Sequence, residues 1–155
     1  MRPSALALLL ALTFCPARGD NAQVMVPATV YFDVSNLAAP TGSTSNPVVV
    51  SFQAAQLESG RVLKVSLRPV ANQFSGPGGT GIAASRVRWT IQGASNGTGF
   101  AGTANPDGFV TVFRSSVQAS SGSVSLNFTL DAPGPGVRAD AHTLALEWQF
   151  ESEPQ

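Results

Sequence analysis

The sequence predicts an all-β protein, an immunoglobulin-like antiparallel β-sandwich of about seven strands, with a small β-barrel as the alternative. Two observations favour this class. After residue 20, apolar and polar residues alternate with a period of two, and no window repeats apolar residues at helical spacing. Segments rich in Gly, Pro, Ser and Asn separate the alternating runs and supply turn chemistry.

Each predicted strand has one apolar face that we expect to lie in the core. The strand at residues 108–114 also alternates, but its pattern does not decide which face is buried. In chain order, the inward-facing sets of the other six are Val24, Val26, Ala28, Val30, Phe32 and Val34; Val48, Val50, Phe52 and Ala54; Leu63, Val65 and Leu67; Val87, Trp89 and Ile91; Val124, Leu126, Phe128 and Leu130; and Leu144, Leu146, Trp148 and Phe150.

The run from Val24 to Val34 is the longest alternating segment. Pro27 removes one backbone donor from it, which is typical of an edge strand. Such an edge is a template for pairing with another chain. Two hypotheses follow: the run closes its own domain as the first strand, or it adds to the sheet of a neighbouring subunit.

The first 19 residues are typical of a secretory signal peptide. Arg2 precedes the ten-residue apolar run 5–14, which is too short for a helix that spans a membrane, since that needs about 20 residues. Small residues at Ala17 and Gly19 predict cleavage before Asp20. Lipidation at Cys15 is the alternative, and the bulky Phe14 before it argues against it.

Residues 20–155 then form one exported domain, secreted or periplasmic and associated in one hypothesis with the cell surface. It contains no cysteine, so no disulfide stabilises it. Removal of Arg2 and Arg18 leaves seven basic against nine acidic residues, a net charge of minus two. We therefore expect no nucleic-acid partner, and no transmembrane segment once the signal is removed.

No catalytic, cofactor-binding or metal-binding residue is assigned. His142 has Asp140 and Asp131 near it in sequence, but a metal site needs three or four converging ligands, so we expect an exposed histidine at a strand start. Residues 97–102 spell G-x-G-x-x-G, yet turn residues follow instead of a helix, which favours a hairpin at Asn96-Gly97. No serine-hydrolase elbow and no glycosidase signature is present.

Two further groups have simple structural explanations. Trp89 and Trp148 lie on apolar strand faces, so we expect both in the core. Four basic residues lie on outward faces, where they are either solvated or form a patch for an anionic ligand: Lys64, Arg68, Arg86 and Arg88.

Residues 85–90 (SRVRWT) and 131–152 (DAPGPGVRADAHTLALEWQFES) resemble bacterial exported immunoglobulin-like β-sandwich surface proteins, in a loosely pilin-like or cell-wall-associated sense. The mature chain differs from chaperone-assembled pilins in lacking a cysteine pair. The resemblance implies a surface or extracellular structural role and transfers no functional residue.

The sequence thus favours a non-enzymatic structural or adhesive surface module that acts through sheet edges and loops. Its partners would be copies of itself or other surface proteins, bound by strand pairing. The alternative is a secreted carbohydrate- or small-anion-binding protein that uses the Gly-rich loops at residues 75–81 and 93–102 at one end of the sandwich.

Overall fold

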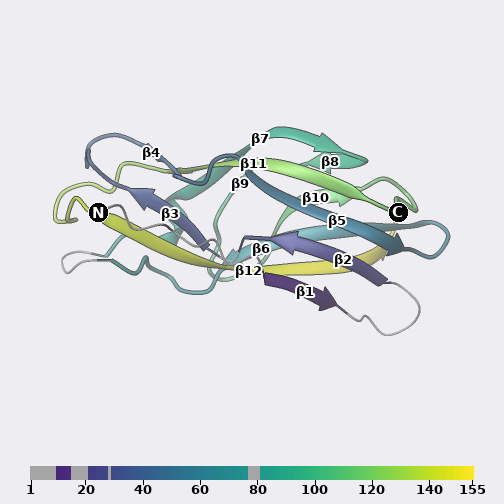
Figure 1. Cartoon of the computed structure of the whole chain (residues 1–155). Coiled ribbons are helices and arrows are strands. Elements are labelled where there is room, and N and C mark those ends of the chain that lie inside the picture. The colour runs from purple at the N-terminus through teal and green to yellow at the C-terminus, as the bar shows by residue number, and fades with distance from the viewer. Residues whose placement is uncertain (1–9, 15–20, 28, 77–80) are drawn as a thin grey trace.

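Two antiparallel sheets make up the computed structural model, which describes residues 10–14, 21–27, 29–76 and 81–155 (Figure 1). Sheet I has the order β1 (Leu10–Phe14), β2 (Asn21–Val26), β5 (Val48–Gln56), β11 (Gly122–Leu130), β7 (Val87–Ser95) and β9 (Gly102–Thr103), and β4 (Thr41–Gly42) also pairs with β11. Sheet II has the order β3 (Thr29–Asp33), β12 (Ala141–Pro154), β6 (Arg61–Pro69), β10 (Val110–Ser115) and β8 (Gly97–Gly99).

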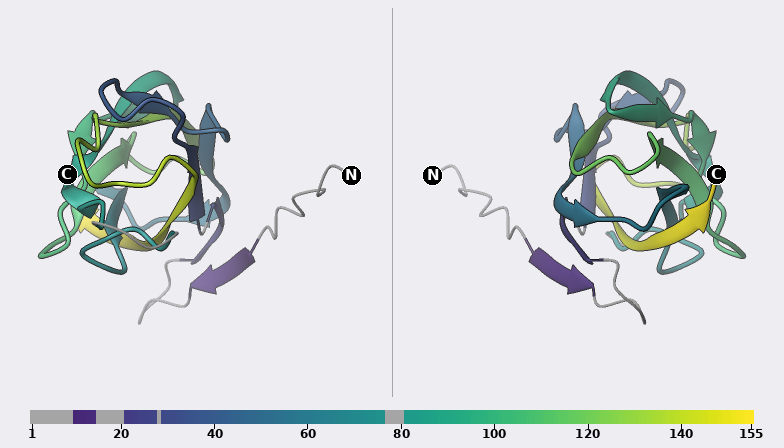
Figure 2. Two further views of the ribbon diagram at one scale, coloured as in Figure 1. Left: turned by 90° about the vertical axis from the view of Figure 1, so that its left-hand side faces the viewer. Right: turned by 90° about the vertical axis from the view of Figure 1, so that its right-hand side faces the viewer.

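The predicted all-β class and two-sheet sandwich are confirmed. When the molecule is viewed along its length, the two sheets curve toward each other around a shared interior (Figure 2). Every predicted run forms strand, and the short strands β1, β4, β8 and β9 are additional. The only helical element among the described residues is a single 3-10 turn, Ala84–Arg86, and no helix there is long and apolar enough to cross a membrane.

The first predicted strand is in fact two strands that belong to different sheets. The run divides around Pro27, with β2 in sheet I and β3 in sheet II. Pro27 offers no N–H for a ladder, so the chain changes sheets there without losing a backbone bond. The apolar alternation continues through the break because the inward residues of both strands face the same core: Val24, Val26, Val30, Phe32 and Val34. The side chain of Ala28 lies outside the described residues.

Tilted aromatic pairs pack in the core, one within sheet I and one between the two sheets. Trp89 on β7 is 1 % exposed, lies 5.9 Å from Phe128 between ring centroids, and donates its indole N–H to the Phe100 carbonyl at 2.9 Å. Phe52 of sheet I and Phe113 of sheet II lie 6.2 Å apart. The predicted core position of Trp89 is confirmed, and such contacts add to area burial.

Two bulges explain where the period-two pattern changes phase. A register shift between Thr111 and Phe113 turns both Val112 and Phe113 into the core, which is why the sequence did not decide the face of β10. A second shift, where β2 meets β5, buries Ala55. The side chain of Ala54, the predicted inward residue, lies outside the described residues.

Asn46 completes a gap in the ladder of β11. Strand β5 pairs with β11 up to Leu126, and β4 pairs with it from Thr129. Between them the Asn46 side chain acts as a substitute peptide group: its Oδ1 accepts the Phe128 N–H at 2.8 Å, and its Nδ2 donates to the Phe128 carbonyl at 2.8 Å. The side chain therefore satisfies a backbone N–H in the middle of sheet I.

The predicted hairpin at Asn96-Gly97 is wrong. After β7 the chain leaves sheet I, and β8 pairs with β10 of sheet II, with Gly97 opposite Ser115. Asn96 adopts a positive φ of 51° at this change of direction. A Cβ on Gly97 would lie 2.4 Å from the Arg114 carbonyl oxygen, so the crossing needs a residue without a side chain.

Candidate functional site

The second half of β12 has one unpaired edge among the described strands. Strand β3 pairs with β12 only over Ala141–Ala145, whereas β6 pairs with it from Leu146 to Pro154. The 14 residues of β12 therefore extend well beyond the five of β3. An unpaired edge of this kind exposes backbone groups that another strand can use.

Two printed hydrogen bonds establish which backbone groups lie on this edge. The Ala145 carbonyl accepts the Val70 N–H at 3.0 Å, and the Gln155 N–H donates to the Gly60 carbonyl at 3.0 Å. The register between them is uninterrupted, so odd-numbered residues of β12 bond to β6. The N–H and C=O groups facing away from β6 are those of even-numbered residues. We call Leu146, Trp148, Phe150 and Ser152 the open edge; in the register of β3, Leu146 stands opposite residue 28, which lies outside the described residues.

Side chains of the open edge help to close the core. Leu146 and Phe150 are buried, and the partly buried Trp148 packs against the core. The Trp148 indole N–H donates to the Pro27 carbonyl at 2.6 Å, at the point where the chain passes between β2 and β3. Trp148 thus ties the start of the open edge to the break between the sheets, and its predicted inward direction agrees with this packing.

Strand β2 lies at the corresponding border of sheet I. Its outer side pairs in antiparallel register with β1, from Leu10 opposite Val26 to Phe14 opposite Ala22. Strand β1 stands away from the body of the molecule in Figure 2 and belongs to the predicted signal peptide, whose cleavage site lies outside the described residues. The pairing demonstrates that the outer side of β2 accepts an antiparallel strand.

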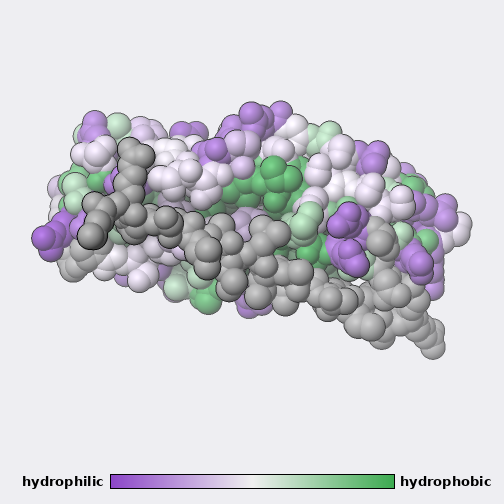
Figure 3. Space-filling view, viewed as in Figure 1, coloured by the Kyte–Doolittle hydropathy of each residue, from purple (hydrophilic) through white to green (hydrophobic). Residues whose placement is uncertain are grey.

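Apolar surface accompanies this border. Met25 on β2 is 37 % exposed and Val49 on β5 is 52 % exposed, whereas most outward residues of sheet I are polar. Figure 3 shows apolar surface in the middle of the face on which β2 and β5 lie. Scattered apolar residues are common on protein surfaces, so these two residues do not by themselves define a binding surface.

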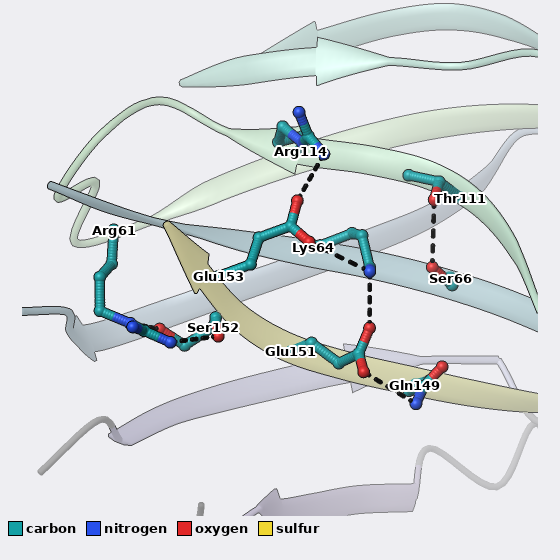
Figure 4. Close-up of polar contacts among 9 residues, drawn as sticks. All are labelled: Arg61, Lys64, Ser66, Thr111, Arg114, Gln149, Glu151, Ser152 and Glu153. Carbon is teal, nitrogen blue, oxygen red and sulfur yellow. Dashed lines mark hydrogen bonds and ion pairs between the residues drawn. The ribbon is translucent and has the colours of Figure 1, made fainter. Parts of the chain in front are cut away.

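A network of charges covers the outward face of β12 beside the open edge (Figure 4). The Lys64 ammonium lies 2.7 Å from Glu151 and 3.1 Å from Glu153, and Arg114 lies 2.5 Å from Glu153. The hydrogen bonds that Lys64 donates to Glu151 and then to Glu153 raise the pKa of Lys64. Burial pushes the pKa of Glu153 upward, but Lys64 and Arg114 outweigh burial and lower it below the ordinary value.

The structure does not bring the histidine and its nearby acids together. His142 is 4 % exposed, so the expectation of an exposed histidine is wrong; its Nε2 lies 2.9 Å from the Arg138 carbonyl. Asp140 bonds to the Ala141 N–H, and Asp131 forms an ion pair with Arg88 at 2.8 Å. Among the described residues, no group of three or more His, Cys, Asp or Glu residues could hold a metal ion.

The two Gly-rich loops lie at opposite ends of β12. Ser75 pairs with Thr143 near the start of that strand. The second loop lies near the other end of that strand. The Asn96 carbonyl accepts the Ser116 N–H, and two residues later the Gln118 N–H donates to the Arg61 carbonyl. Arg61 in turn pairs with Pro154 at the end of β12. The residues of the G-x-G-x-x-G sequence lie in β8, β9 and their connection, with no helix after them. The described residues of the two loops therefore do not form one shared site at one end of the sandwich.

The four outward basic residues do not form a common patch. Lys64 and Arg68 lie on β6 in sheet II, whereas Arg88 lies on β7 in sheet I and Arg86 directly precedes it. Each already has a partner: Arg68 pairs with Glu147 at 2.7 Å, Arg86 donates to the Ala132 carbonyl, and the others form the ion pairs given above. These four basic residues are therefore solvated charges, each with its own partner, and not an anion-binding patch.

Sequence reasoning missed the open edge of β12. The alternation from Leu144 to Phe150 predicts a strand, but an alternating pattern does not say how far a neighbouring strand extends. One feature of the sequence could have indicated this edge. Pro27 interrupts the first alternating run, and if that run changes sheets at the proline, it covers only part of the strand beside it.

Comparisons with known proteins give no further assignment. The chain matches no protein-family model, and searches of curated proteins and of solved structures find no match.

Proposed function

We propose that this protein is an exported, non-enzymatic structural module that joins to further copies of itself by strand addition at the open edge of β12. The single observation that carries the proposal is the edge itself: backbone N–H and C=O groups of Trp148 and Phe150 face away from β6, with no described strand opposite them. Strand addition gives affinity through main-chain hydrogen bonds.

Two further features support this proposal. The outer side of β2 accepts an antiparallel strand of this same chain, so the two sheets each offer an edge at the same border of the sandwich. The described residues contain no group of three or more His, Cys, Asp or Glu residues that could hold a metal ion. Export rests on the predicted signal peptide, and a mature chain that begins at Asp20, as measured by intact mass, would support it. A lipid-modified chain that begins at Cys15 would contradict cleavage before Asp20.

Hydrogen exchange of individual amides tests the proposal. In dilute exported protein, we expect the N–H groups of Leu146, Trp148 and Phe150 to exchange faster than those of Gln149 and Glu151, which bond to β6. As the protein concentration rises, multimers should form, and the three even-numbered amides should become protected. The two odd-numbered amides are the internal control and should change little.

A strictly monomeric protein at high concentration, with unchanged exchange at the open edge, would rule out this function. Multimers that leave these three amides unprotected would show that the chain associates through another surface.

A further inference from the structure

Arg61 reaches from β6 to the far side of β12. It lies opposite Pro154 in the register of the two strands. Its Nε donates to Ser152 Oγ at 2.7 Å, and its Nη2 donates to the Ser152 backbone carbonyl at 2.5 Å (Figure 4). The Arg61 guanidinium thus binds both oxygens of Ser152, which lies two positions before Pro154, the cross-strand partner of Arg61.

The Ser152 carbonyl belongs to the open edge. Ser152 has the same parity as Leu146, Trp148 and Phe150, so its carbonyl faces away from β6. A strand that continued along β12 past Phe150 would need this carbonyl as an acceptor. A charged guanidinium already occupies it, and charge-assisted hydrogen bonds are about twice as strong as neutral ones.

We propose that Arg61 is a stop for strand addition: it confines an incoming strand to Leu146–Phe150 and thereby sets the register and length of pairing. This inference rests on the proposed function. Natural sheets protect their edges with charged side chains that make further pairing unfavourable. Here one charge protects only the last part of the edge and leaves the preceding five residues available.

The position of Arg61 suits this role because its side chain is anchored at both oxygens of Ser152. Two other basic residues at this end of sheet II, Lys64 and Arg114, instead contact Glu151 and Glu153, which are odd-numbered and lie on the outward face. Arg114 therefore provides a matched control, since its removal takes a positive charge from the same end of sheet II without touching Ser152.

The test compares the exported wild-type protein with Arg61→Ala, Arg61→Lys and Arg114→Ala. Association is measured by sedimentation, and amide exchange is measured at low and high protein concentration. In the wild type and in Arg114→Ala, association should protect Leu146, Trp148 and Phe150 but not Ser152. In Arg61→Ala, protection should extend to Ser152, and association should strengthen about two- to tenfold, as expected for one added hydrogen bond.

Arg61→Lys keeps the charge but loses the planar guanidinium that binds two oxygens. Its association strength and its protection of the Ser152 amide should therefore lie between those of the wild type and Arg61→Ala. It also provides a second variant if Arg61→Ala unfolds, which denaturant titration detects. Ser152 protection in the associated wild type, or identical exchange in all four proteins, would overturn the stop while leaving the proposed function in place. Absence of association in every protein would overturn both. Association of Arg61→Ala alone would also overturn both, since the wild type would then not associate and Arg61 would block pairing altogether instead of limiting its length.

Discussion

Replacing Asn46 by Ala tests whether one side chain completes the ladder of β11. The substitution removes the acceptor of the Phe128 N–H and one of the two donors to the Phe128 carbonyl, which keeps its bond from the Ser43 N–H at 3.0 Å. A backbone N–H left without a partner costs about 1–3 kcal/mol, and the lost second donor adds up to about 1 kcal/mol. We therefore expect the free energy of unfolding to fall by about 1–4 kcal/mol.

Asn36→Ala is the matched control, because Asn36 Oδ1 accepts only the N–H of Ala38, two residues away in an exposed turn. We expect that variant to lose less than about 1 kcal/mol. Urea titration gives both free energies, and amide exchange at Phe128 should accelerate in Asn46→Ala alone. Equal losses in the two variants, or unchanged exchange at Phe128, would show that Asn46 does not support the ladder.

Three further predictions concern the core residue Trp89, the crossing between the sheets at Gly97, and the charge of Glu153. Trp89→Ala should cost about 3–5 kcal/mol in denaturant melts, whereas Arg88→Ala on the exposed face should cost less than about 1; comparable losses would contradict the assigned faces. Gly97→Ala should lose about 1–3 kcal/mol through its clash with backbone, and Gly93→Ala, with nothing within 4 Å, should change little; calorimetry distinguishes them. Because the folded pKa of Glu153 is lowered, its stabilisation is present above the ordinary carboxyl pKa and is lost as pH falls through the folded value. Glu153→Gln should flatten this acidic limb in melts recorded across pH, and an unchanged limb would argue against the ion pairs.

Strand faces were largely predictable because alternation is a local property. Side chains of successive residues point to opposite sides of a strand. The apolar residues Val124, Leu126 and Phe128 therefore predict the buried face of β11 without any information about the strands that pair with it. Exceptions occur where pairing inserts an extra residue. At β10 the bulge buries both Val112 and Phe113, and such a shift depends on the partner strand.

The candidate site was less predictable because its parts are distant in sequence. Arg61 and Ser152 are 91 residues apart, and nothing in either segment indicates the other. Likewise, His142 looked exposed from its place at a strand start, yet its packing against the loop that contains Gly76 buries it. Contacts of this kind follow from topology and not from local pattern.

The sequence by itself determined that the chain forms strands, which side chains of most strands face inward, and where turns separate them, since each depends on neighbouring residues alone. Only the tertiary structure decided that the first run divides between two sheets at Pro27, that β3 stops pairing at Ala145, and that the open edge begins at Leu146. The physical reason is that a strand's edges are satisfied by partners far away in the chain, and the extent of each pairing is set by the packing of both sheets around one core.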